Sequence, residues 1–163
     1  MDLETLREVA ESLSIEEFAR KYRGFFLART GEPIDIPSGV FTVIREFEHD
    51  SRPAAPTWQI IRVMKAVSNA RSAEPISIGR DRNCDIVLRD SSASKIHAYL
   101  RLNDQDDRLE LIDNGSSNGT RVDGRRIAKD GTETVRVGAV LDFGGVSVLL
   151  LNAAGLYALA RKR

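Results

Sequence analysis

Apolar residues recur at every third or fourth position at the start of the chain, and charged residues occupy the positions between them. The apolar positions are Leu3, Leu6, Val9, Ala10 and Leu13. This spacing predicts an amphipathic helix. Ser14 and Glu17 then have the spacing of a capping box, which predicts a second short helix that ends at Gly24.

The pattern changes to short strand-like runs after the second helix. Aromatic and β-branched residues predict strands at residues 25–28 and 41–47, and a proline-bearing stretch at residues 51–57 interrupts the pattern. We therefore expect residues 1–50 to form a small segment of helices and strands, and residues 51–57 to be a linker.

Short apolar or alternating runs follow the expected linker. They are residues 58–67, 76–79, 85–88, 96–102, 109–113, 120–122, 126–127, 134–137, 140–143 and 146–151. Asp123-Gly124 and Gly144-Gly145 lie where hairpin turns with positive φ are needed. The pattern predicts a mainly β domain at residues 58–151, built as an antiparallel sandwich. Asn152 is the expected N-cap of a short C-terminal helix within residues 152–163.

The composition limits the chemistry that the chain can carry. Its 163 residues, 42% of them hydrophobic, are enough for one packed domain with a small appendage. A lone cysteine, Cys84, excludes an internal disulfide, and together with two histidines it is too few for the usual zinc sites. We expect no metal and no cofactor. The start of the chain lacks the apolar core of a signal peptide and no run approaches membrane-spanning length, so we expect a cytoplasmic protein without membrane contact.

The net charge is zero, but the charges are unevenly distributed. Residues 1–50 hold 6 Lys and Arg against 11 Asp and Glu, a net charge of −5, and the remaining residues hold 18 against 13, a net charge of +5. Such asymmetry is typical of separate modules or of a basic surface that meets an anionic ligand. Two ordinary solvated surfaces would give the same numbers, so both interpretations stay open.

Three loops between the expected strands carry the candidate chemistry. The first is Gly79-Arg80, where glycine would let the backbone turn so that the guanidinium faces outward. The second begins with the hydroxyl of Ser94 and the ammonium of Lys95. The third, residues 114–120, combines asparagines, glycines and hydroxyl residues, which is typical of successive turns with free side-chain amides. A planar cation with neutral donors on rigid turns is what a phosphate group requires.

The order and spacing of these loops resemble those of the forkhead-associated (FHA) domain over about residues 58–150. The resemblance implies a sandwich of two twisted antiparallel sheets that binds phosphothreonine peptides. It assigns phosphopeptide binding to Arg80, Ser94, Lys95, Ser117 and Asn118, and support of the site to Gly79, His97 and Gly119. Ser117 stands where many relatives have threonine, and it keeps the hydroxyl.

The resemblance implies a phosphothreonine-dependent adaptor or signalling module that reads the targets of Ser/Thr kinases. The expected partner is a phosphothreonine-containing protein, with a Ser/Thr protein kinase as a second candidate. The alternative is a phosphate-independent structural or secretion-assembly component built on the same sandwich. Some relatives with arginine two positions before the motif serine prefer an acidic residue in the peptide. Ser92 stands at that position, so the sequence supports no acidic preference.

Two other function classes are not expected. Ser94, His97 and Asp113 could be imagined as a hydrolase triad, but no nucleophile elbow or oxyanion loop accompanies them, so we expect no enzyme. The basic residues 161–163 give too few phosphate contacts for a nucleic-acid binder. The oligomeric state stays open.

Overall fold

The computed structural model describes residues 3–30, 58–65, 74–102 and 108–162. Its helices are α1 (Leu3–Ser12), α2 (Ile15–Lys21) and α3 (Ala153–Ala160). Its strands are β1 (Phe25–Thr30), β2 (Trp58–Arg62), β3 (Ile76–Gly79), β4 (Ile86–Val87), β5 (Ala98–Leu102), β6 (Arg108–Asp113), β7 (Thr120–Val122), β8 (Arg125–Arg126), β9 (Thr132–Arg136), β10 (Val140–Phe143) and β11 (Val146–Asn152). The expected strand at residues 41–47 and the expected linker at residues 51–57 lie outside the described residues.

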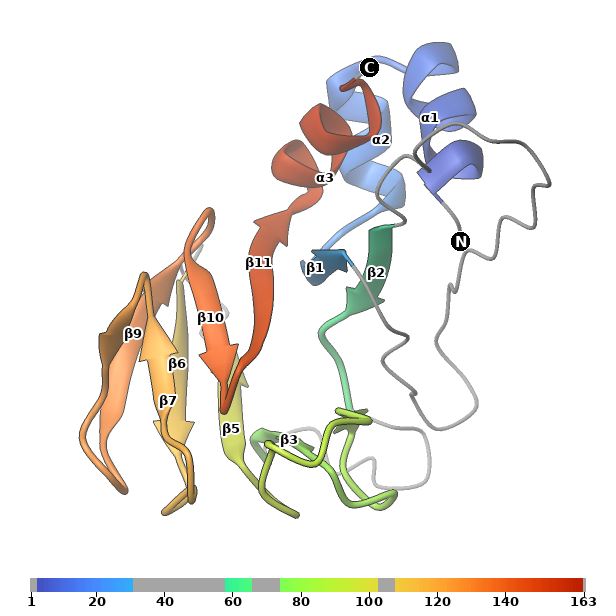
Figure 1. Ribbon diagram of the computed structural model, residues 1–163. Helices are drawn as coiled ribbons and strands as arrows, with labels where there is room; N and C mark the ends of the chain where they lie inside the picture. The colour runs from blue at the N-terminus through green and yellow to red at the C-terminus, as the bar shows by residue number, and fades with distance from the viewer. Residues whose placement is uncertain (1–2, 31–57, 66–73, 103–107, 163) are drawn as a thin grey trace, which may run out of the picture.

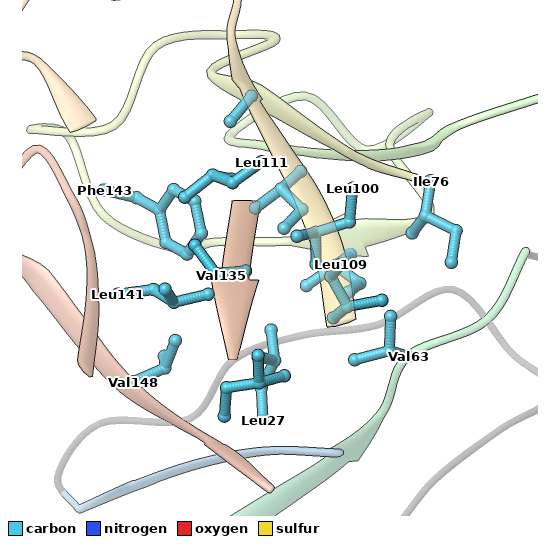
Figure 2. Close-up of a cluster of buried hydrophobic side chains, with 14 of the residues drawn as sticks. Leu27, Val63, Ile76, Leu100, Leu109, Leu111, Val135, Leu141, Phe143 and Val148 are labelled. Atoms are coloured by element: carbon cyan, nitrogen blue, oxygen red, sulfur yellow. The ribbon is translucent and has the colours of Figure 1, made fainter. Parts of the chain in front are cut away.

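Two sheets pack face to face, as the sequence predicts. Sheet A has the strand order β2-β1-β11-β10-β7-β8, and sheet B has the order β4-β3-β5-β6-β9. The side chains between them form one apolar core, which includes Leu100, Leu109, Leu141 and Phe143 (Figure 2). The expected mainly β sandwich of two sheets is therefore confirmed.

One pairing departs from the expected antiparallel pattern. β4 runs parallel to β3, with Ile86 opposite Ile78. The cause lies in the residue before β4, because the Asp85 carboxylate accepts hydrogen bonds from the backbone N–H and the hydroxyl of Ser77, both at 2.8 Å. The Asp85 N–H in turn donates to the Ser77 hydroxyl at 2.9 Å. These contacts hold the chain beside the start of β3, so that β4 continues in the same direction.

Strand β1, from the front segment of the chain, lies inside sheet A. It pairs with β11, with Phe25 opposite Asn152, and with β2, with Leu27 opposite Ile61. Leu27 is fully buried and points into the sandwich core among side chains that include Val63 and Val148 (Figure 2). The expected division into a small segment at residues 1–50 and a sandwich at residues 58–151 therefore does not describe this strand. The sequence pattern misplaces it because strand pairing between distant segments leaves no local signal.

A second apolar cluster lies between the outer face of β1, β2 and β11 and the three helices. Phe18 is fully buried there, and its ring centroid lies 4.4 Å from that of Tyr22 and 5.2 Å from that of Tyr157. The Arg7 guanidinium donates to the Ala160 carbonyl at 3.2 Å and so ties α1 to the end of α3. Figure 1 shows the helices grouped at the end of the molecule where β11 stops, away from the turn between β10 and β11. None of the described helices is long and apolar enough to cross a membrane.

The predicted N-caps and hairpin turns are present, but α2 ends at Lys21 with Tyr22 as its C-cap, before the predicted end at Gly24. Ser14 and Glu17 form both hydrogen bonds of the capping box at the start of α2. The Asn152 side chain accepts from the Gly155 N–H at 2.9 Å and caps α3. α3 ends at Ala160, and Arg161 is its C-cap. The turn residues Asp123-Gly124 and Gly144-Gly145 all have positive φ, as two-residue hairpin turns require.

Candidate functional site

Gly79 ends β3 where the strand passes close to the second loop. A Cβ atom at this position would lie 2.2 Å from the Lys95 carbonyl oxygen and 2.9 Å from the His97 nitrogen, both of them backbone atoms. Gly79 is not among the glycines with positive φ. The structure gives a further reason for this glycine, because two backbone segments approach each other closely here.

The approach at Gly79 lets the first two loops share backbone hydrogen bonds. The Arg80 N–H donates to the Ser94 carbonyl, and the Asp81 N–H donates to the Lys95 carbonyl, each at 2.9 Å. The Arg80 side chain is exposed, and its Nε donates to the Ala93 carbonyl at 3.1 Å. Within the described ranges no carboxylate forms an ion pair with Arg80. The bond from Nε fixes the start of the guanidinium and leaves its two outer nitrogens for an anion.

Ser94 and Ser117 bring the second and third loops together. The Ser117 N–H donates to the Ser94 hydroxyl oxygen at 3.0 Å. Because that oxygen accepts a hydrogen bond, the Ser94 O–H remains a donor for another group. The side chains of Ser117 and Lys95 are exposed beside it. Hydrogen bonds thus connect Arg80 to Ser94 and Ser94 to Ser117, so these three residues belong to one surface.

His97 lies beneath this surface and is fully buried. Its Nδ1 accepts from the Ser94 backbone N–H at 3.0 Å, and its Nε2 lies 3.2 Å from the Gly119 carbonyl, to which it donates. Burial lowers the pKa of His97, which favours the neutral imidazole with its proton on Nε2. With both ring nitrogens engaged by the backbone, the imidazole is not placed to take a proton from the Ser94 hydroxyl.

Asn118 and the β10–β11 turn contact the second and third loops beside this surface. The Asn118 amide donates to the Ser92 carbonyl at 2.8 Å, and the side chain is exposed. Gly144 donates its N–H to the Gly119 carbonyl at 3.0 Å, and a Cβ on Gly144 would lie 2.4 Å from the Ser92 carbonyl oxygen. The turn is therefore packed against both loops, and Gly144 has a steric role in addition to its positive φ.

Asp113 organises the third loop, although the sequence suggests it only as a member of a hydrolase triad that is not expected. The residue is buried, and its carboxylate accepts from the Ser116 hydroxyl at 2.5 Å, the Thr120 hydroxyl at 2.6 Å and the N–H groups of Ser116 and Asp130 at 3.1 and 3.3 Å. Burial alone raises the pKa of Asp113, but the hydrogen bonds from Ser116 and Thr120 outweigh it and hold the pKa below its usual value. The sequence signal for this role is the spacing of Asp113 and Ser116, because an aspartate can hydrogen-bond a turn that follows it.

Asp113→Asn should destabilise the domain. The amide would turn an oxygen that accepts hydrogen bonds into a donor facing other donors, at a cost of about 2 kcal/mol in unfolding free energy. Because folding lowers this pKa, the carboxylate contributes stability above the unfolded pKa of about 4, and that stability is lost as the pH falls through the folded pKa. Urea unfolding at pH 7 should therefore give a lower unfolding free energy for the variant than for the parent. The difference between the two free energies should narrow below about pH 4.

Glu110→Gln is the matched control for Asp113→Asn, because it makes the same change on the same strand at a partly exposed ion pair with Arg101. Such a surface pair contributes about 1 kcal/mol or less. Equal unfolding free energies for the two variants at pH 7 would show that Asp113 does not organise the loop.

Comparison with known proteins gives matches over part of the chain. Residues 76–144 match the model of the FHA domain. The chain is 37% identical over 84 residues to the oxoglutarate dehydrogenase inhibitor of Corynebacterium jeikeium, a match that covers 46% of this chain and 57% of that protein. It is 36% identical over 69 residues to protein phosphatase 2C 70 of Arabidopsis thaliana, with 42% of this chain and 12% of that protein covered.

The fold also matches a solved structure. The FHA domain of the CT664 protein from Chlamydia trachomatis is similar with a TM-score of 0.52 and 23% identity, covering 79% of this chain and 98% of that one. By contrast, the chain spans 57% or less of the length of the two curated relatives. All eight residues that the sequence singles out for the site lie within the matched residues 76–144.

Proposed function

We propose that this chain, which contains an FHA domain at residues 76–144, is a phosphothreonine-dependent protein-binding module. The observation that carries the proposal is the convergence of Arg80, Ser94 and Ser117 through hydrogen bonds between three loops. Arg80 keeps its outer guanidinium nitrogens free of carboxylates within the described residues. A rigid cation with hydroxyl donors beside it matches a phosphate group.

Each residue has a distinct role in the proposed complex. A phosphothreonine carries a charge of about −1.5 to −2 and three acceptor oxygens. Arg80 binds two of the oxygens through its outer nitrogens, and the hydroxyls of Ser94 and Ser117 donate to the phosphate from the neighbouring loops. Lys95 adds a second positive charge at the rim. Asn118 uses its side-chain oxygen for the peptide backbone, since its amide nitrogen is held by Ser92.

The buried layer below the surface keeps these groups in place before the ligand arrives. His97 joins the Ser94 N–H to the Gly119 carbonyl, and the carboxylate of Asp113 gathers the donors of the third loop. Rigid binding groups lose little conformational entropy when the ligand binds. The same contacts engage the imidazole fully, which favours a binding role over a catalytic one.

The module would act as an adaptor in the cytoplasm, reading proteins that Ser/Thr kinases have phosphorylated. The kinase itself is a second candidate partner if it carries a phosphothreonine. A structural or assembly role without phosphate remains the competing function, because the sandwich alone would serve it. Phosphate dependence separates the two, since a phosphate-independent component would bind its partner equally well when dephosphorylated.

A phosphothreonine peptide selected from a degenerate library should bind with a dissociation constant of order 1 μM, about 8 kcal/mol. Its unphosphorylated form should not bind detectably, because the cation and hydroxyls then lack their ligand. The phosphoserine form should bind about fourfold more weakly, since one methyl group contributes about 0.8 kcal/mol when buried.

Calorimetry with the three matched peptides is the measurement. Equal affinity for threonine and phosphothreonine forms, or no binder in the library, would favour the assembly role. Equal affinity for the phosphoserine and phosphothreonine peptides would show that the methyl group does not contribute to binding, and phosphate recognition would still stand.

A further inference from the structure

The hairpin of β7 and β8 carries three arginines at the edge of sheet A, and only two of them form ion pairs. Arg121 lies 3.8 Å from the Asp142 carboxylate, and Arg125 pairs with Glu133. Arg126 is exposed, and within the described ranges no carboxylate pairs with it. Arg126 is thus the arginine of this hairpin whose charge is not balanced.

The guanidinium of Arg126 lies against the backbone of the third loop. An ideal Cβ on Gly119 would meet the Cζ, Nε and Nη2 atoms of Arg126 at 2.6, 2.6 and 2.7 Å. The guanidinium therefore occupies the space that a side chain at residue 119 would fill. Gly119 directly follows Asn118, which the proposed function places on the peptide backbone. Arg126 accordingly lies at the border of the proposed site, on a different element from Arg80.

The register of the hairpin makes this position electrostatically unfavourable without an additional anion. Arg126 is directly opposite Arg121, and like charges at opposed positions of an antiparallel pair are destabilising. The nearby carboxylate of Asp142 pairs with Arg121 and also accepts from the Gly145 N–H and the Ser147 hydroxyl, each at 2.9 Å. Asp142 is therefore already engaged. An anion bound beside Gly119 would relieve the repulsion between the two arginines.

We propose that Arg126 is a specificity-determining residue, which binds an acidic side chain of the peptide within a few residues of its phosphothreonine. This inference rests on the proposed function and adds a second contact to it. A guanidinium binds a carboxylate through two parallel hydrogen bonds, a geometry that favours Asp or Glu over neutral side chains.

Ser92, where some relatives have an arginine, cannot supply this contact. Its side chain is uncharged, and its hydroxyl donates to the Asp90 carboxylate at 2.6 Å. The sequence alone supports no acidic preference for that reason. Arg126 provides the charge from the edge hairpin instead.

The test is a scan of a single glutamate through the positions on both sides of the phosphothreonine in a binding peptide, with glutamine at the same position as the reference. Glutamate at one position should raise the affinity about three- to tenfold, equivalent to about 0.7–1.4 kcal/mol. Arg126→Gln should remove this gain and leave the affinity of the glutamine peptide unchanged. Arg126→Glu should favour lysine at the same position.

Arg125→Gln is the matched control, because Arg125 is the adjacent residue and already pairs with Glu133. It should keep the glutamate gain. A gain that persists in Arg126→Gln, or no gain at any position, overturns the inference while phosphothreonine binding stands. If no phosphothreonine peptide binds the parent chain, the proposed function fails and this inference fails with it. Thermal melting of each variant checks that the exposed substitutions leave the fold intact.

Discussion

Arg80→Ala should abolish detectable phosphopeptide binding without unfolding the domain. Removing one partner of a desolvated charge pair costs about 2–5 kcal/mol, which moves a micromolar dissociation constant towards millimolar. The side chain is exposed and its single hydrogen bond to described residues goes from Nε to the Ala93 carbonyl, so little stability depends on it. Calorimetry with the best phosphothreonine peptide and a melting curve of the same sample make the two measurements.

Two further variants sharpen this experiment. Arg82→Ala removes an exposed arginine from the same loop, two residues away, and should bind like the parent. Arg80→Lys keeps the charge but loses the planar fork and the Nε donor, so it should bind with intermediate affinity. If Arg80→Ala keeps the parental affinity, the proposed phosphate site is wrong. If Arg82→Ala loses as much affinity as Arg80→Ala, binding depends on the net charge of the loop and not on the position of Arg80.

Removal of residues 1–52 should prevent the sandwich from folding. The deletion takes away β1, which pairs with both β2 and β11, and the helices α1 and α2, which cover the outer face of these strands. A domain is stable by only about 5–15 kcal/mol, and the loss of an interior strand exceeds that margin. Circular dichroism and one-dimensional NMR of the truncated protein are the measurements. A cooperative melt with retained phosphopeptide affinity would show that the front segment is an independent module.

A single substitution tests the interior position of β1 with a smaller loss of stability. Leu27→Ala should lower the unfolding free energy by about 2–5 kcal/mol, because the fully buried side chain leaves a cavity in the sandwich core. Ile15→Ala is its control, since this large apolar side chain is 42% exposed and its loss should cost far less. Similar losses for the two variants would contradict the interior position of β1.

Local patterns in the sequence predict much of this fold. The capping box of Ser14 and Glu17, the N-cap at Asn152 and the glycine-rich turns depend on residues only a few positions apart. The positions of most strands follow from short-range alternation in the same way. Pairing is different. Neither the insertion of β1 between β2 and β11 nor the parallel direction of β4 has a local pattern, because both depend on contacts between separated segments.

The same distinction between local patterns and long-range contacts applies to the site. The residue types and spacing of Arg80, Ser94 and Asn118 indicate anion binding from the sequence alone, through their resemblance to a family. The buried contacts beneath them leave no such pattern. The need for glycine at residue 79 comes from the backbone of the second loop, and the engagement of Asp113 comes from donors that include Thr120 and Asp130. Arg126 joins the site through a hairpin register, which composition cannot reveal.

The place of β1 also constrains the order in which the chain can fold during synthesis. Phe25 pairs with Asn152, so sheet A joins strands that leave the ribosome 127 residues apart. Until β11 and α3 emerge, Phe26 and Leu27 have no partners from that side and remain exposed apolar surface. Contacts over such separations form slowly, and the waiting segments are prone to aggregation. Folding of this sandwich is therefore expected to wait until β11 has been synthesised, with the front strand in a non-native state until then.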